Sequence, residues 1–500
     1  MSAKEDHIAM RRVFDAYWYG PIAAVRPYLL VRVFLALLAF DTWVVMVQHG
    51  GRYGIGGFNV AHFEVLDLIQ PTPTPAIYLG TLFLCGMLSM GMVLYTPTRF
   101  GLATVTATYT YSWSMSMLDS YQHHYLLSLM LLSITLMPIQ RLEDVLPEPR
   151  VSKVQGTRST RRAPLHIEAW GFVSVCCTSS IVYFYTAVTK MEPDWRAGNA
   201  LRRLLSQHQN AFELQHGLGL SAEFFWPLMA ASAIALQLVI GLAYVLAPLQ
   251  DRCSNSPNLR WLHRTLPWFG VPALLFHAGV EAMELELGWF SYYMFALIAV
   301  AFLPARWLES TLRWSSFPYR FFRVSVVGAT AQTSDKEPLV VDLAVSALSV
   351  GVTALLGAQL DLPGAGTASL LAALLVFFQA WIVRLSRDKR SRRNKRISTR
   401  ALELSPVLAA LFMFCAIWCS DVRFDYYRFV GGDLRRRGDL EASLDAYVKA
   451  NRYAPRSCDA LHDESLPPAK RRCDRRREAA AVARSIRTNN RLRAPLPGVQ

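Results

Sequence analysis

The sequence predicts an all-α fold: a polytopic helical membrane protein of about eleven transmembrane helices with a small α-helical C-terminal tail. Only 18% of its 500 residues are charged and 53% are hydrophobic, whereas a soluble chain carries nearer a quarter charged residues. Apolar windows of about 20 residues recur along the chain, and a helix of that length crosses the hydrocarbon core of a bilayer. Basic residues gather in alternate loops, as the positive-inside rule requires.

The expected spans are about 24–48, 76–95, 100–118, 121–138, 167–190, 225–247, 266–284, 289–306, 339–358, 365–385 and 402–420. They predict a membrane domain of about eight spans at 15–310, a group of about three at 311–420 and a basic soluble tail at 421–500. The start MSAKEDHIAMRR is polar, and the first apolar segment is too long for a signal peptide, so we expect no removable leader.

Lysine and arginine predict the orientation in the membrane. They occur in the loops 139–166, 249–265, 307–338 and 384–400, and are absent from the turns 119–122, 285–288 and 359–364. We therefore expect a multi-pass protein of the cell (inner) membrane with a cytoplasmic N-terminus and the tail outside. The loop 384–400 holds nine basic residues and one acidic residue. We expect it to touch anionic membrane lipids and not nucleic acid.

The tail contains FVGGDLRRRGDLEASLDAYVKANRYAP, which resembles one tetratricopeptide repeat within 424–457. A plain amphipathic hairpin is the alternative. One repeat cannot bury its own face, so the tail would bind a protein partner or pack on the membrane domain. The eight cysteines show no metal-ligand spacing, and we expect no metal. Cys458 and Cys473 could form a disulfide in an oxidising compartment.

Ionisable residues inside spans are costly and are therefore candidates for function. The first span contains Arg32 and Asp41, nine residues apart on opposite faces of the helix. Each needs a partner on another helix or must reach toward an interface. A structural polar clamp is the alternative to a functional role.

The stretch MLDSYQHHYLL is a sharp turn into the fourth span and contains Asp119, His123 and His124. Adjacent histidines on a helix point about 100° apart, so we expect only one of them to face a given site. At a helix N-terminus the macrodipole favours the neutral imidazole, which can donate to or accept from a substrate oxygen. Interfacial histidines without a functional role are the alternative.

Lys190 closes the fifth span in IVYFYTAVTKMEPDW, and His277 lies in the second half of the seventh. On the predicted topology, these residues and His123 reach one leaflet from three separate spans, which predicts a site at that boundary. A lysine in poorly hydrated surroundings can act as a base, because burial favours its neutral form. A lysine that snorkels to the headgroups is the alternative.

Four stretches carry a resemblance to a known family: RVFLALLAFDTW, LDSYQHHYLLSL, IVYFYTAVTKMEPDWRAG and FHAGVEAMELELGWFSYYMFA. Over about residues 15–310 the chain resembles the vitamin K-dependent gamma-carboxylases and their bacterial relatives, the HTTM (horizontally transferred transmembrane) domain proteins. The third stretch is similar to the carboxylase segment Ile-Val-Tyr-Phe…Lys-x-x-x-Asp-Trp-x-x-Gly, with matches at Lys190, Asp194, Trp195 and Gly198. His123 matches the family's active-site histidine, and His277 also matches.

The resemblance implies a carboxylase-type lyase in which Lys190 is the base that deprotonates a vitamin K-type hydroquinone (menaquinol). Oxygenation would then yield a strong base that removes a proton from a glutamate side chain, and carbon dioxide would add. The catalytic residues would be Lys190, His123 and His277, and a peptide or protein would be the substrate on the outer face. We expect support from Asp194, Trp195, Gly198, Asp119, His124, Arg32 and Asp41.

The chain departs from the family pattern in three places. Gln122 replaces an asparagine, the segment before Gly288 is one residue longer, and the large lumenal region that binds the propeptide in animal carboxylases is absent. Two hypotheses therefore remain: a quinol-dependent carboxylase/epoxidase-like enzyme, or a non-catalytic accessory protein for maturation or export of a secreted peptide. A transporter is less supported, because we find no inverted repeat and no pair of Gly/Pro-broken spans.

Overall fold

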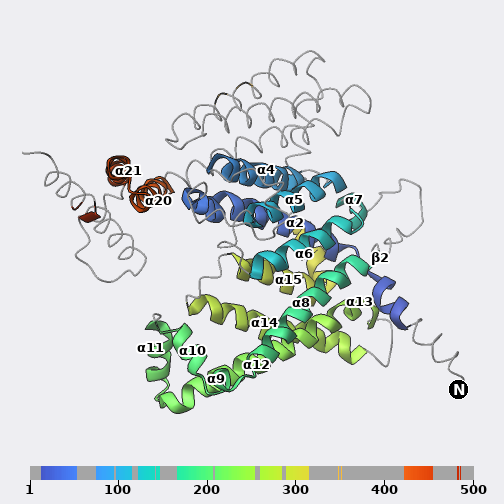
Figure 1. The fold of residues 1–500 in the computed structure, drawn as a ribbon. Coiled ribbons are helices and arrows are strands. Elements are labelled where there is room, and N and C mark those ends of the chain that lie inside the picture. The colour runs from blue at the N-terminus through green and yellow to red at the C-terminus, as the bar shows by residue number, and fades with distance from the viewer. Residues whose placement is uncertain are drawn as a thin grey trace, which may run out of the picture. The chain divides into compact units, whose positions relative to one another are not determined.

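The computed structural model describes residues 13–52, 75–94, 97–114, 122–140, 142–146, 166–206, 209–253, 260–283, 289–314 and 422–453, with a few isolated positions beyond. These residues are mostly helical (Figure 1). They form two compact units. Unit 1 comprises Met1–Leu37, Thr96–Thr106 and Gln122–Ser334, and unit 2 comprises Leu38–Tyr95, Ala107–Tyr121 and Asp335–Gln500. The last three predicted spans lie almost wholly outside the described residues, and Cys458, Cys473 and Asp119 lie outside them too.

Unit 1 contains most of the long helices. They are α6 (Gln122–Leu136), α7 (Leu142–Val145), α8 (Trp170–Thr189), α9 (Pro193–Arg196), α10 (Asn199–Leu204), α11 (Gln209–Gly217), α12 (Ala222–Leu246), η5 (Ala247–Leu249), α13 (Gln250–Cys253), α14 (Arg260–Ala282) and α15 (Phe290–Phe302). Unit 2 contains η1 (Asp41–Val45), η2 (Met46–Arg52), α4 (Pro75–Leu94), α20 (Val422–Arg436) and α21 (Leu440–Tyr453). The helices α2 (Val25–Phe40) and α5 (Arg99–Ser114) belong partly to each unit.

Each of the first eight predicted spans coincides with a helix. Not all of these helices are long and apolar enough to count as membrane spans. Three are long and apolar enough to cross a bilayer: Val25–Val45, Trp170–Thr189 and Ala222–Cys253. A fourth exists if Phe290–Phe302 and Ala305–Trp314, bent by 118°, form one span. The helix α14 begins six residues before the predicted span at 266, in the polar stretch RWLHR. The count of eleven spans stays a prediction.

A two-stranded ribbon adds a detail that the all-α prediction did not include. β1 (Pro21–Ala23) and β2 (His166–Glu168) pair antiparallel, with Ile22 opposite Ile167. Strands of three residues are too short to give a periodic signal in the sequence. Their pairing depends on contacts between segments about 145 residues apart, which local sequence cannot specify.

The long helices of unit 1 alternate in direction. α8 and α12 run antiparallel. The Ser180 hydroxyl in the middle of α8 donates to the carbonyl of Gly241 near the end of α12, while Gly198, beyond the end of α8, lies against Trp226 near the start of α12. The ends of these helices therefore form two sets. We call the set around the last turn of α8 the Lys190 end and the opposite set the Arg26 end.

The Arg26 end is held by a buried ion pair that the sequence did not predict. The guanidinium of Arg26, 1% exposed, donates to the carboxylate of Asp251 at 2.8 Å and to the side-chain oxygen of Gln250 at 2.9 Å. It also donates to the backbone carbonyls of Val300 and Ala301. The start of α2 is thereby tied to α13 and to the end of α15.

The helices of unit 1 also expose apolar stripes. On α6 the stripe is Tyr125, Leu129, Leu132 and Leu136, and on α8 it is Ile181, Tyr185 and Val188. These positions recur at helical spacing and so share one face of each helix. Exposed apolar stripes of this kind are expected on helices that contact lipid.

In unit 2 the tail forms a helical hairpin. α20 and α21 meet at Gly438, whose φ of +87° lies in the left-handed region, and the Ser443 hydroxyl donates to the carbonyl of Gly431. Their core contains Phe424, Tyr447 and Ala450. Both a tetratricopeptide repeat and a plain amphipathic hairpin have this shape, so the repeat stays a prediction. α20 also packs against η2.

Candidate functional site

The end of α8 places Lys190 at the boundary of an apolar helix. Pro193 disfavours helical geometry at Glu192, whose ψ is 148°, so the helix ends at Thr189 and Lys190 is its C-cap. The Lys190 Nζ donates to the carbonyl of Thr186 at 3.4 Å and lies 5.3 Å from the centre of the Trp195 ring. Because the side chain is half-buried, its pKa falls below the usual value of lysine.

The other residues of the Lys…Asp-Trp…Gly pattern shape the turn that follows. Asp194 does not serve Lys190 as a counter-ion: its carboxylate forms an exposed ion pair with Arg203 on α10. Gly198 has a φ of +76°, and a Cβ atom there would lie 2.4 Å from the backbone carbon of Trp226. Only glycine accepts both the conformation and this approach to α12. This turn positions the Trp195 ring against the ammonium of Lys190.

His277 lies buried within α14, with 1% of its surface exposed. Its Nε2 and the hydroxyl of Tyr183 on α8 are 2.5 Å apart, and which of the two donates depends on the tautomer. Its Nδ1 is buried and has no hydrogen-bond partner. Buried polar atoms are normally satisfied, so an unsatisfied one needs an explanation.

Aromatic rings surround His277. The centres of Phe276, Phe290 and Phe295 lie 5.4, 5.9 and 6.0 Å from the imidazole. Phe290 also lies 5.8 Å from the ring of His123 at the start of α6. Two of the predicted site histidines thus lie around one phenylalanine, although no contact joins them directly among the described side chains.

A second unsatisfied group lies on the far side of Tyr183. The ring of Tyr244 on α12 stacks on that of Tyr183, with centres 5.8 Å apart and planes 20° from parallel. The Tyr244 hydroxyl is buried without a hydrogen-bond partner. Tyr183 therefore lies between two side chains that each present an unsatisfied polar atom.

Lys190 lies beyond this aromatic group on the same side of α8. Seven residues separate Tyr183 from Lys190, which puts them within about 20° of each other around the helix and about 10 Å apart along it. Lys190 and Tyr183, the partner of His277, therefore lie on one face of α8.

Three of the predicted supporting residues lie on other elements: Arg32, Asp41 and His124. Arg32 lies on α2 in unit 1, and Asp41 is buried at the start of η1 in unit 2. His124 is buried and its ring lies 4.3 Å from that of His123. Among the described residues no three His, Cys, Asp or Glu side chains could hold a metal ion together.

Sequence reasoning missed Tyr183, Tyr244 and Phe290. In an apolar span a tyrosine or phenylalanine looks like packing, and only its contact with a polar ring distinguishes it. One signal was present: Tyr183 precedes Lys190 by two helical turns and so shares its face. The partner on α14 could not be inferred, because it is 94 residues away.

The comparison with known families agrees with the membrane architecture. The HTTM domain model matches residues 27–307. This range includes most of α2, the helices of the Lys190 end, and α13, whose Asp251 forms the ion pair with Arg26. No solved structure matches the chain significantly. Since the matched region exceeds half of the sequence, the chain belongs to the family of HTTM domain membrane proteins.

Proposed function

We propose that the chain is a quinol-dependent membrane enzyme of the carboxylase/epoxidase type, with its active site at the Lys190 end. One observation carries the proposal: a half-buried lysine shares a helix face with Tyr183, which holds a buried histidine whose second nitrogen has no partner. Ionisable groups whose ionisation is perturbed by burial are enriched at active sites.

The residues fit a vitamin K-type hydroquinone. Phe276, Phe290 and Phe295 offer faces and edges to a flat aromatic ring. The unsatisfied Nδ1 of His277 is a hydrogen-bonding atom that a quinol hydroxyl can use. A quinol also dissolves in the bilayer, so a site at a membrane boundary can receive it without crossing water.

The chain's own residues supply proton transfer and positioning. A neutral Lys190 amine accepts a proton from a quinol hydroxyl, and burial increases the share of that neutral form. Tyr183 fixes the orientation of the His277 ring. The bound hydroquinone supplies reducing power and, with oxygen, the basicity needed for carboxylation. The aromatic rings limit access of water to the reacting groups.

His123 is the third proposed catalytic residue. It lies at the start of α6, where the dipole favours its neutral form, and it packs against Phe290. We assign it a hydrogen bond to a substrate oxygen. Asp194, Trp195 and Gly198 are positioning residues, because they shape the turn under Lys190.

The proposed location is the cell membrane with the Lys190 end outside. The contact of α20 with η2 supports the predicted side of the tail. η2 follows the first span and α20 follows the last, so their contact requires an even number of crossings between them. The ten spans predicted between these elements meet that condition.

The test is quinol epoxidation and bicarbonate fixation in membranes that contain the wild type, Lys190→Ala or Lys449→Ala. Lys449 is an exposed lysine of α21 and controls for the substitution itself. We expect epoxide and fixed label with the wild type and with Lys449→Ala, and neither with Lys190→Ala. Equal activity in all three would overturn the role of Lys190.

An accessory function in maturation or export of a secreted peptide is the second candidate. The α20–α21 hairpin favours it, because such a hairpin is a common partner-binding module. No epoxide with any of the three proteins, at wild-type expression, would favour this alternative over the enzyme.

A further inference from the structure

Buried polar atoms without hydrogen-bond partners gather where α14 ends and α15 begins. They are Nδ1 of His277 and Oε1 of Glu281 on α14, Oγ of Ser291 on α15 and Nε1 of Trp226 on α12. Trp226 belongs to this end because Met283, just beyond α14, packs against its apolar cluster. Unpaired buried polar atoms are rare in proteins, so a group of them at one end needs an explanation.

Glu281 is the member of this group with the strongest need of a partner. Its side chain is half-buried, and its Oε1 is shielded from solvent without a hydrogen-bond donor. A carboxylate oxygen taken out of water without a donor costs more than a neutral oxygen in the same place. A ligand that donates a hydrogen bond to Glu281 would remove this cost.

His277 and Glu281 share one face of α14. Glu281 follows by four residues, and this spacing places the Cβ atoms of two helical residues about 5–6 Å apart. Nε2 of His277 already contacts the Tyr183 hydroxyl, so Nδ1 is the ring nitrogen left for a ligand. One hydroxyl group between the two side chains can meet both Nδ1 and the carboxylate.

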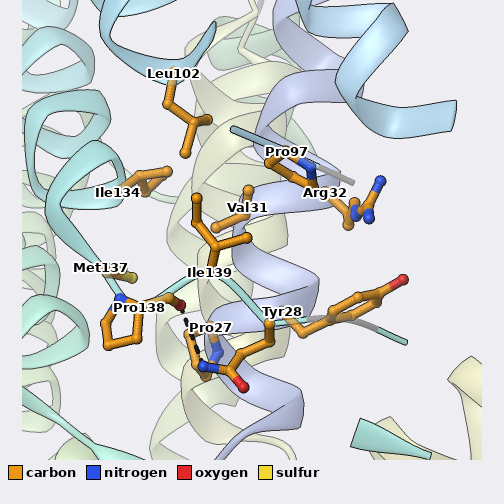
Figure 2. A pocket seen from close by; sticks show the side chains of 11 residues that line it. Pro27, Tyr28, Val31, Arg32, Pro97, Leu102, Ile134, Met137, Pro138 and Ile139 are labelled. Carbon is orange, nitrogen blue, oxygen red and sulfur yellow. Dashed lines mark hydrogen bonds between the residues drawn. The ribbon is translucent and has the colours of Figure 1, made fainter. Parts of the chain in front are cut away.

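A pocket elsewhere in unit 1 is too small to hold such a ligand. It lies between α2, the start of α5 and the end of α6 and is lined by Val31, Leu102 and Ile134, among others (Figure 2). Its cavity volume is about 10 Å³, which is enough for about one water molecule. It therefore does not compete with the group around Glu281 as a place for a quinol-sized ligand.

The two redox forms of a quinone offer different atoms to a carboxylate. A hydroquinone has two O–H donors. Its two-electron oxidation removes both hydrogens and leaves two carbonyl oxygens, which only accept hydrogen bonds. An ionised carboxylate also only accepts, so Glu281 can bind the hydroxyl of the reduced form but not the carbonyl of the oxidised form.

We propose that Glu281 is a specificity-determining residue, which makes the site at the Lys190 end bind the reduced form of its quinone in preference to the oxidised form. One ligand hydroxyl donates to the carboxylate of Glu281 and contacts Nδ1 of His277. The same arrangement favours release of the oxidised product, because a carbonyl offers Glu281 no donor. This role rests on the proposed function, in which that site binds a vitamin K-type hydroquinone.

The experiment measures dissociation constants by isothermal titration calorimetry with the purified full chain in lipid nanodiscs. The probes are menadiol and menadione, the reduced and oxidised forms of one naphthoquinone, and oxygen is excluded so that no turnover occurs. We expect the wild type to bind menadiol more tightly. In Glu281→Gln, whose amide can donate to a carbonyl, this preference should fall at least about ten-fold, the effect of one hydrogen bond to a charged group. Glu213→Gln is the matched control and should keep the wild-type preference, because Glu213 is an exposed glutamate of α11.

A second variant keeps the charge. Glu281→Asp withdraws the carboxylate by one methylene and should weaken menadiol binding while menadione binding stays as in the wild type, even if Glu281→Gln does not fold. An unchanged preference in Glu281→Gln, or equal affinity of the wild type for both probes, would overturn the role of Glu281 and leave that of Lys190 untouched. Retained turnover in Lys190→Ala would overturn the proposed function without changing the preference. Binding of neither probe by the wild type would overturn both.

Discussion

The two ends of unit 1 bury polar side chains in opposite ways. At the Arg26 end the guanidinium is surrounded by acceptors: the carboxylate of Asp251, the side chain of Gln250 and the carbonyls of Val300 and Ala301. Toward the Lys190 end, Nδ1 of His277 has no partner, and neither has the hydroxyl of Tyr244, which lies in the last turn of α12. A buried polar group with a structural role needs hydrogen-bond partners within the protein. A buried polar group without partners is expected where a ligand supplies the missing hydrogen bonds.

The largest expected difference concerns ion pairs. Asp251→Ala leaves Arg26 buried without its counter-ion, which should lower the free energy of unfolding by about 3–5 kcal/mol. Asp194→Ala removes the exposed pair with Arg203 at the other end and should change it by less than about 1 kcal/mol. Thermal melting of the detergent-solubilised protein measures both. Similar losses from the two variants would remove the contrast between the ends.

The next effect concerns the turn under Lys190. Gly198→Ala introduces a side chain at a φ of +76° and against the backbone of Trp226, which should destabilise the fold by about 2–3 kcal/mol. Gly217→Ala is the matched control, because nothing lies within 4 Å of a Cβ atom there. Melting temperatures of the two variants provide the test. A harmless Gly198→Ala would mean that the turn is not fixed by α12.

A smaller effect distinguishes two buried tyrosines. Tyr183→Phe removes the partner of His277 Nε2 and should lower the free energy of unfolding by about 1–2 kcal/mol. Tyr244→Phe removes a hydroxyl that has no partner, so stability should stay the same or rise. If the ligand-free protein melts earlier with Tyr244→Phe than with Tyr183→Phe, the assignment of satisfied and unsatisfied groups is wrong.

The smallest expected effect is on the pH dependence of turnover. Only the neutral amine of Lys190 accepts a proton, so the rate should rise with pH as the ammonium loses its proton. Because burial lowers the pKa of Lys190, the midpoint should lie below that of free lysine, about 10.4. A pH–rate profile of quinol oxidation measures it. A midpoint at or above the value of free lysine would contradict the buried base.

Much of the Lys190 end could be predicted from local sequence. Hydropathy places Lys190 at the end of a span, and counting spans brings His123 and His277 to the same side of the membrane. The residues between them could not be predicted, because Tyr183 meets His277 and Phe290 meets His123 only through the packing of different helices. A span's hydropathy does not say which neighbour its aromatic residues contact.

The Arg26 end shows the same limit more strongly. Arg26 lies at the start of the first span and Asp251 lies in a stretch that reads as a polar loop, 225 residues later. Nothing in either stretch points to the other. Arg32 and Asp41 looked like the significant charges of the first span, because they lie deeper in its apolar run, yet the buried ion pair is formed by Arg26.

The central claim is that Lys190 serves chemistry and not stability. The most direct test measures melting temperature and turnover of reduced quinone for Lys190→Met and the wild type in the same lipid nanodiscs. Methionine keeps the apolar stem of lysine and removes only the amine. The account predicts that turnover falls by at least about 100-fold. The melting temperature should stay within about 2 °C, since the Lys190 amine makes only a long hydrogen bond and one ring contact among the described residues. Retained turnover, or a loss of stability as large as that of Asp251→Ala, would contradict it.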